Sequence, residues 1–204
     1  MDLYAPDPAT LSLRDVARGL AYTCRYGGHV KNYYSVAEHS VLVRDLLRWQ
    51  GGSPDVLRAA LFHDAAEAYL GDVVAPLKWA LRRQSIAQDA HYMGGWPPDV
   101  AGHRSPYDVL EDRMEGAIVL RFGLDPAALQ SPDLRAADMW ALRIEAERLT
   151  ESGGSHWRWT GELPNDGRCP GQIPWEGGLE PDRARVLWLD AVGAPAKDYE
   201  HGDG

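Results

Sequence analysis

The sequence predicts an all-α fold, in which a single domain is built as a helical bundle. Three observations predict it: apolar residues recur at helical spacing in several segments, helix-capping residues precede those segments, and strand-like alternation is almost absent. A chain of 204 residues suits one domain with a full hydrophobic core. We therefore expect the predicted helices to pack around one common interior.

Most of the predicted helices begin after a residue whose side chain can accept hydrogen bonds from the first backbone N–H groups. Two of them also carry an acidic residue three positions later, Asp15 and Glu38, which is the pattern of a capping box. Proline opens the others, because its fixed backbone angle suits the first helical turn. In chain order the predicted helices and their start signals are 12–22 (Ser12), 36–49 (Ser35), 54–70 (Ser53-Pro54), 77–83 (Pro76), 107–123 (Ser105-Pro106), a short turn (Asp125-Pro126), 133–150 (Ser131-Pro132) and 182–192 (Pro181).

The segments outside these helices define the expected organisation of the chain. Residues 1–11 are predicted to form an extended arm, because they contain two prolines. Residues 12–152 form the expected domain, and paired glycines and prolines within 84–104 indicate an insertion or a lid. Residues 153–204 are rich in tryptophan, glycine and proline, so we expect irregular coil and a last helix that pack on the domain.

Composition excludes several classes of function. The formal net charge is -9 and no basic stretch of any length is present, which argues against binding of nucleic acid. No segment is apolar enough to span a membrane, and the N-terminus does not have the pattern of a signal peptide. The two cysteines, Cys24 and Cys169, lie far apart, as is usual for a cytoplasmic protein with reduced thiols.

Four residues form a possible set of ligands for one divalent metal ion. They are His39, the adjacent pair His63-Asp64, and Asp138, and each stands on a predicted helix. Two imidazoles and two carboxylates suit Mn, Fe, Co, Ni or Zn. Metal sites in helical domains are built where side chains from facing helices converge, so we expect these three helices to meet.

Two further carboxylates lie close to this set in the sequence. Glu67 stands four residues after His63 and three after Asp64, and these spacings share one face of a helix. In that position it could hold a water molecule or protonate a leaving oxygen, or it could be an ordinary solvated carboxylate. Asp72 follows Gly71 and could orient water or a second ion, or simply cap the loop.

In this region the chain resembles the HD-domain phosphohydrolases, helical metalloenzymes with the pattern His … His-Asp … Asp. The resemblance covers residues 10–150 and is strongest with a phage and prophage branch typified by YfdR, which is related to the YfbR-type 5'-deoxynucleotidases and to phage dATP triphosphohydrolases. The segments that carry it are TCRYGGHVKNYYSVAEHSVLV, ALFHDAAEAYLGDVVAPLK, LEDRMEGAIVLRFGL and AADMWALRIEAERL.

This resemblance implies an activity. The four ligands would bind Mn, Co, Ni, Fe or Zn, with Mg also possible for a polyphosphate substrate, and Glu67 and Asp72 would assist catalysis. The expected substrate is a 5'-nucleotide of the 2'-deoxy type, which would lose its phosphate or polyphosphate. Arg25 would contact the substrate phosphate or sugar, and Lys78 would lie near the phosphates. The resemblance further implies a homo-oligomer in the cytoplasm of a bacterium or of a phage-infected host.

Two residues beside Arg25 complete the candidate substrate contacts, Tyr26 and His29. Tyr26 could stack on a base. His29 follows a pair of glycines next to the expected phosphate position, and it could touch the substrate or be a loop histidine with no role. Two other functions use the same residues. One is a phosphodiesterase for cyclic nucleotides or dinucleotides, and the other is a nucleotide-binding module without catalysis.

Overall fold

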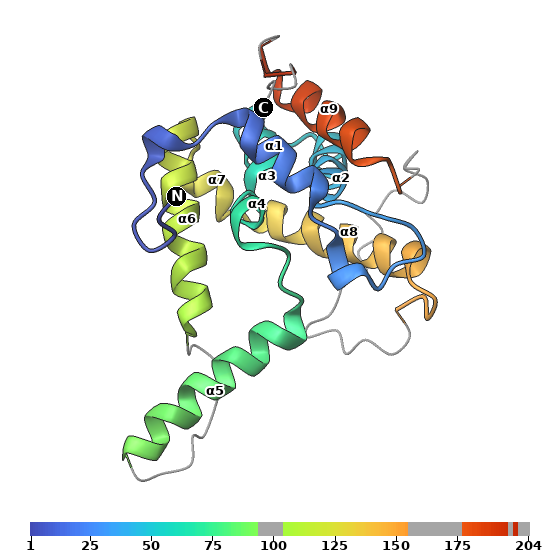
Figure 1. Cartoon of the computed structure of the whole chain (residues 1–204). Helices are drawn as coiled ribbons and strands as arrows, with labels where there is room; N and C mark the ends of the chain where they lie inside the picture. The colour runs from blue at the N-terminus through green and yellow to red at the C-terminus, as the bar shows by residue number, and fades with distance from the viewer. Residues whose placement is uncertain (94–103, 155–176, 196–197, 200–204) are drawn as a thin grey trace.

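The computed structural model describes residues 1–93, 104–154, 177–195 and 198–199, and this part of the chain is helical without a strand, which confirms the expected all-α class (Figure 1). Two short 3-10 turns accompany the α-helices. In chain order the elements are η1 (Pro8–Thr10), α1 (Leu13–Tyr22), η2 (Arg25–Gly28), α2 (Val36–Trp49), α3 (Pro54–Phe62), α4 (Glu67–Leu70), α5 (Ala75–Met93), α6 (Pro106–Phe122), α7 (Pro126–Leu129), α8 (Pro132–Leu149) and α9 (Pro181–Val192).

The helix starts lie where the capping residues predict them. Each cap accepts a hydrogen bond from a backbone N–H two or three residues further along the chain, which satisfies one of the free donors at a helix N-terminus. Glu38 completes a full capping box with Ser35, and Asp108 completes a second one with Ser105. The residues whose side chains cap a helix in this way are Ser12, Ser35, Ser53, Ser105, Asp125 and Ser131.

The expected continuous helix over 54–70 is wrong in one respect, because it is divided in two. α3 ends at Phe62, and α4 begins at Glu67. Between them the backbone forms tighter hydrogen bonds, from Ala65 N–H to the Phe62 carbonyl and from Glu67 N–H to the Asp64 carbonyl, at 2.9 Å each. Bonds of this i to i+3 type wind the chain more narrowly than an α-helix does. The turn therefore changes the directions in which the side chains at 63–66 point.

α5 is longer than predicted. It continues through residues 84–93, where the sequence was expected to become irregular, because proline and glycine are absent until Gly94. Residues 94–103 of the proposed lid lie outside the described residues. α5 contacts α6 and otherwise extends away from the bundle (Figure 1). The N-terminal arm also differs from the expectation, since η1 forms one turn of 3-10 helix in it.

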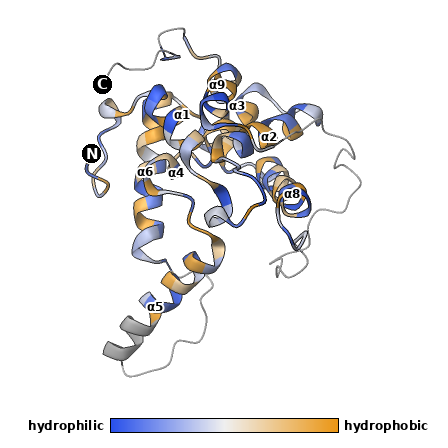
Figure 2. Ribbon diagram, turned by 45° about the vertical axis from the view of Figure 1, so that its right-hand side comes forward, coloured by the Kyte–Doolittle hydropathy of each residue, from blue (hydrophilic) through white to orange (hydrophobic). Residues whose placement is uncertain are grey.

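α2 lies at the centre of the bundle and contacts α1, α3, α8 and α9. Its side chains join two clusters of buried apolar residues, one shared with α1, α3 and α9 and the other with α3 and α8. Figure 2 shows hydrophobic residues gathered where these helices face one another. Because α2 is covered on nearly all sides, a polar side chain on it needs a partner inside the protein.

The described part of the C-terminal segment packs on this bundle. α9 contacts α1 and α2, and the fully buried Trp188 donates from its indole N–H to the Leu61 carbonyl at 2.9 Å. Just before α9, the Leu179 N–H donates to the carboxylate of Glu38 at 2.9 Å. The tryptophans at 157, 159 and 175 lie outside the described residues.

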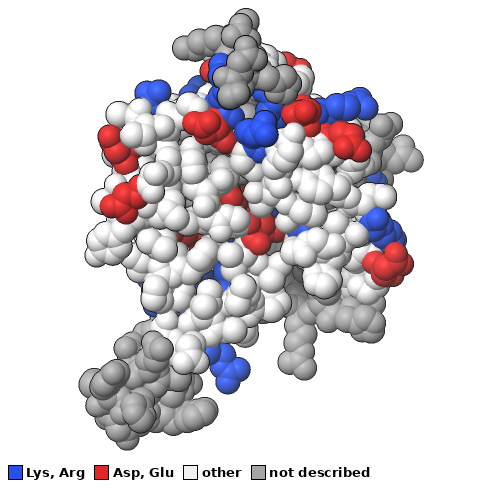
Figure 3. All heavy atoms as spheres, viewed as in Figure 1, with Lys and Arg blue, Asp and Glu red and all other residues white. Residues whose placement is uncertain are grey.

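The described surface is mixed in charge. On the face shown in Figure 3, acidic and basic side chains are interspersed among uncharged ones. None of the helices that the structure describes has the length and hydropathy required of a transmembrane span.

Candidate metal centre

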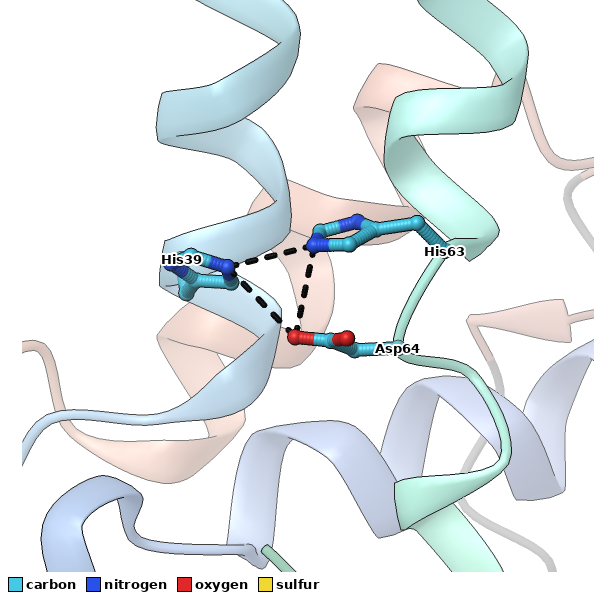
Figure 4. Close-up of side chains that lie close together, drawn as sticks. All are labelled: His39, His63 and Asp64. Atoms are coloured by element: carbon cyan, nitrogen blue, oxygen red, sulfur yellow. Dashed lines mark hydrogen bonds and ion pairs between the residues drawn. The ribbon is translucent and has the colours of Figure 1, made fainter. Parts of the chain in front are cut away.

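Three of the four predicted ligands meet in a compact cluster (Figure 4). His39 reaches it from the first turn of α2, and His63 and Asp64 reach it from the end of α3 and the following turn. The two imidazole Nε2 atoms are 3.2 Å apart, and the Asp64 Oδ2 atom lies 3.4 Å from that of His39 and 3.3 Å from that of His63. These three residues could hold a metal ion.

Asp138 approaches the same point from α8. Its Oδ1 atom lies 3.1 Å from Nε2 of His39 and 3.8 Å from Nε2 of His63. The Asp138 side chain is 41% exposed, whereas that of His39 is fully buried. The expected convergence of three helices is therefore present, and Asp138 stands at its solvent side.

Hydrogen bonds on the far side of each ring fix which nitrogen faces the cluster. Nδ1 of His63 is 2.8 Å from the Ala60 carbonyl, and Nδ1 of His39 is 2.6 Å from Oε1 of Glu145. A carbonyl and a carboxylate accept hydrogen bonds, so each Nδ1 carries the proton. In a neutral ring the lone pair then sits on Nε2, which is the nitrogen that points into the cluster.

Two lone pairs and two carboxylates that face one another require a positive charge between them. The pKa values of His63 and Asp138 reflect this electrostatic requirement. Burial disfavours the charged form of His63, but attraction to Asp64 and Asp138 outweighs it and raises the pKa to about 9. Desolvation likewise opposes ionisation of Asp138, yet the hydrogen bonds that it accepts from His39 and His63 when these rings are protonated hold its pKa well below the usual range. A bound metal cation would supply the same positive charge.

Arg25 lies against this cluster. It is 8% exposed, and its Nη1 atom is 3.4 Å from Oδ2 of Asp64. It stands in η2, where Tyr26 adopts a left-handed backbone with φ of 59° and is followed by Gly27 at the same angle. Left-handed angles are uncommon for residues other than glycine, so other contacts must hold this turn.

Asp72 supplies one of those contacts. Its Oδ2 atom accepts a hydrogen bond from the Tyr26 backbone N–H at 2.8 Å. Asp72 thus fastens the turn that carries Arg25, a contact that the sequence did not indicate. His29 ends the same turn, where its side chain is exposed and its N–H donates to the Tyr26 carbonyl at 3.1 Å.

Glu67 is a buried carboxylate beside the cluster. It is 5% exposed, and its Oε2 atom has no hydrogen-bond partner among the residues that the structure describes. Burial, together with repulsion from Asp64 and Asp72, raises its pKa well above the usual value. Such surroundings favour the protonated form of the carboxyl group, which can deliver its proton to a nearby oxygen.

Lys78 lies on the first turns of α5. Its Nζ atom is 2.8 Å from Oε1 of Glu111, and it stands 5.5 Å from the centre of the Tyr107 ring. Burial opposes its charge, but the contact with Glu111 and attraction to Glu67 raise its pKa. Lys78 is therefore within electrostatic range of Glu67.

Glu145 is the site residue that the sequence analysis missed. It is fully buried in α8 and touches His39. Burial opposes its charge, but attraction to Arg25 and His39 lowers its pKa to about 2. A signal for it exists, because Glu145 follows Asp138 by seven residues and this spacing places both on one face of a helix.

Curated proteins similar to this chain include two from bacteria. It is 37% identical over 156 residues to the uncharacterized protein RCAP_rcc00048 of Rhodobacter capsulatus, in a match that covers 73% of this chain and 68% of that protein. It is 32% identical over 145 residues to the uncharacterized protein YfdR of Escherichia coli, with 71% of this chain and 65% of YfdR covered. No family model matches the chain. The chain belongs to the family that contains RCAP_rcc00048, and the expected similarity to YfdR is confirmed.

Proposed function

We propose that this protein is a metal-dependent phosphohydrolase of the HD-domain type, which removes the 5'-phosphate or polyphosphate from nucleotides, mainly deoxynucleotides. The observation that carries the proposal is the inward direction of both imidazole Nε2 atoms. Their lone pairs face each other at 3.2 Å next to Asp64, with the Nδ1 side of each ring fixed by a hydrogen bond. Such an arrangement is stable when a cation lies between the donors.

In this proposal His39, His63, Asp64 and Asp138 hold a divalent ion of the Mn, Co, Ni, Fe or Zn type. When bound, the ion would supply a Lewis acid for phosphoryl oxygens and would lower the pKa of its bound water. Solvent access at Asp138 leaves room for substrate on that side, since its side chain is 41% exposed.

The other residues bind the substrate, supply a proton to it or support the residues that do so. Arg25 presents a guanidinium beside Asp64, where it binds the phosphate oxygens and balances their charge. Glu67 would donate the proton that the leaving oxygen needs, because burial and two neighbouring carboxylates raise its pKa and favour its protonated form. Lys78 adds positive charge near Glu67, and Asp72 keeps the Arg25 turn in place. Positioning and charge balance of this kind are most of what phosphoryl transfer requires.

The test is a product assay with matched variants. Purified protein is incubated with Mn²⁺, Co²⁺ or Mg²⁺ and each dNMP, each dNTP and the matching ribonucleotides. Nucleoside with orthophosphate would define a 5'-nucleotidase, and nucleoside with tripolyphosphate would define a triphosphohydrolase. His63→Ala, which removes a ligand, is expected to abolish either product. Absence of nucleoside with every metal would overturn the proposal, and hydrolysis of cyclic nucleotides or dinucleotides instead would identify a phosphodiesterase.

A further inference from the structure

The carboxylate of Glu145 contacts polar groups of several residues besides the predicted ligand His39. Its Oε1 atom lies 2.6 Å from Nδ1 of His39 and 2.9 Å from the hydroxyl of Tyr34, which donates to it. Its Oε2 atom accepts a short hydrogen bond from the Tyr26 hydroxyl and lies 3.3 Å from Nε of Arg25. Both oxygens are thus occupied, in a side chain that is 0% exposed.

The contact with His39 decides the state of that ring. Because a carboxylate accepts, Nδ1 of His39 must donate, and Nε2 is left to face Asp64 and Asp138. Asp138 and Glu145 lie two turns apart on α8, and the His39 ring lies between them, with one nitrogen directed at each. The ring can therefore neither flip nor change tautomer without losing one of these contacts.

The second oxygen of Glu145 reaches the turn that carries Arg25. Tyr26 has the left-handed backbone in that turn, and its hydroxyl ends on Glu145. The guanidinium of Arg25 spans from Glu145 to Asp64, with 3.3 Å to the first and 3.4 Å to the second. One carboxylate thus contacts both a ligand of the metal cluster and the residue proposed to bind phosphate.

We propose that Glu145 is a positioning residue that orients His39 for the metal and holds the Arg25 turn against the same cluster. This inference rests on the metal site of the proposed function but not on its chemical reaction. Carboxylates that hydrogen-bond to ligating histidines raise the affinity of the metal, and their removal typically costs about 10- to 100-fold. We expect Glu145 to have an effect of that size without touching the ion.

Two substitutions test it, with Co²⁺ alone as the probe. Glu145→Gln keeps the volume and one acceptor oxygen but loses the charge, and Glu145→Leu removes both acceptors. We expect Co²⁺ affinity, measured by calorimetry, to fall about 10-fold for the first and about 100-fold for the second. The visible Co²⁺ spectrum should change with it, since the His39 ring is no longer held. Asp108→Asn is the matched control, a buried carboxylate of α6 that should leave affinity and spectrum unchanged.

The outcomes separate this inference from the proposed function. A folded Glu145→Gln protein with the original Co²⁺ affinity and spectrum would overturn the inference. If Glu145→Leu does not fold, the result for Glu145→Gln alone decides. Lower affinity in Asp108→Asn equal to that in Glu145→Gln would also overturn it, because the loss would then be general destabilisation. If the original protein binds Co²⁺ and Glu145→Gln weakens that binding while no nucleotide is hydrolysed, the proposed function fails and the inference stands.

Discussion

Nδ1 of His39 lies 2.6 Å from Oε1 of Glu145, and both side chains are completely buried between α2 and α8. An imidazole and a carboxylate are expensive to remove from water unless each polar atom finds a partner. Here the ring has a partner at each nitrogen, and each carboxylate oxygen has two. The contact of α2 with α8 is therefore specified by polar geometry as well as by apolar packing, which explains why α2 can carry a histidine in its most enclosed part.

Replacement of Glu67 by glutamine is expected to lower nucleotide hydrolysis by about 100- to 10,000-fold, the usual contribution of a positioned proton donor. Glutamine has nearly the same shape as glutamate but cannot donate a proton of suitable acidity. Because Glu67 is not one of the proposed metal ligands, Co²⁺ affinity should remain near that of the original protein. Steady-state product assays measure the loss of hydrolysis, and titration with Co²⁺ measures the metal affinity. Glu147→Gln is the control and should leave both unchanged, because Glu147 pairs with Arg143 on an exposed face of α8. Hydrolysis within threefold of the original protein would exclude Glu67 as the proton donor.

The sequence predicts the helices well because the signals at their ends are local. Ser35 with Glu38 is an example, since the residues that form the capping box are three positions apart. The division between α3 and α4 could not be predicted in this way. It depends on whether Glu67 N–H bonds to Asp64 or to His63, and the same residue types permit both. This choice is made by packing around the turn, which the sequence pattern does not contain.

The site divides along a similar line. The residues His39, His63 and Asp64 are recognisable because their types and order suit a metal. The sequence predicts that Asp72 assists catalysis or orients a second ion, whereas its contact in the structure is with the Tyr26 backbone. That contact joins residues 46 positions apart in the sequence, and no local sequence pattern predicts it. Glu145 has the helical spacing from Asp138 that would reveal it, but many exposed carboxylates share such spacing.

Gly19 is expected to be required for the contact of α1 with α4. A Cβ atom at this position would lie 2.6 Å from both the Cβ and the carbonyl oxygen of Ala68, which follows Glu67. Gly19→Ala should therefore destabilise the protein by about 1–3 kcal/mol, despite the better helix propensity of alanine. Gly116 on α6 is the matched control, because nothing lies within 4 Å of its Cβ position. Gly116→Ala should stabilise by about 0.5–1 kcal/mol, and urea unfolding measures both. Equal effects at the two positions would contradict the predicted close approach.

Trp188 is expected to make α9 part of the same cooperative unit as the bundle. It is 0% exposed, it meets Phe62 edge to face with ring centres 5.2 Å apart, and it donates to the Leu61 carbonyl. Trp188→Ala should cost about 3–5 kcal/mol through the cavity that it leaves. Val186, two residues earlier and 38% exposed, serves for comparison, and Val186→Ala should change stability by less than about 0.5 kcal/mol. If thermal unfolding of Trp188→Ala showed no loss of stability, the description of α9 as packed on the bundle through Trp188 would be contradicted.

Asp108 is expected to stabilise the junction of α5 and α6 in a manner that depends on pH. Its carboxylate accepts from Arg82 at 2.6 Å and 3.0 Å, and from the Ser105 N–H and hydroxyl at 2.7 Å and 2.8 Å. The hydrogen bonds from Arg82, more than any other contact, hold the pKa of Asp108 well below its usual range. Asp108→Asn loses the charge in these bonds and should cost about 1–2 kcal/mol at pH 7.

The direction of the pH dependence follows from that lowered pKa. In the unfolded chain Asp108 takes up a proton at about pH 4, the usual pKa of an aspartate side chain. The folded protein keeps it ionised to lower pH. The stabilisation is therefore complete above about pH 5 and disappears as the pH falls through about 4 toward the folded pKa. Urea unfolding at pH 7, 4 and 3 should show the difference between Asp108→Asn and the original protein shrinking only at the last two. Glu147, which pairs with Arg143 on an exposed face, gives the control, because Glu147→Gln should change stability by less than about 0.5 kcal/mol at each pH. A difference for Asp108→Asn that is the same at all three pH values would show that the ionised carboxylate is not what holds α5 to α6.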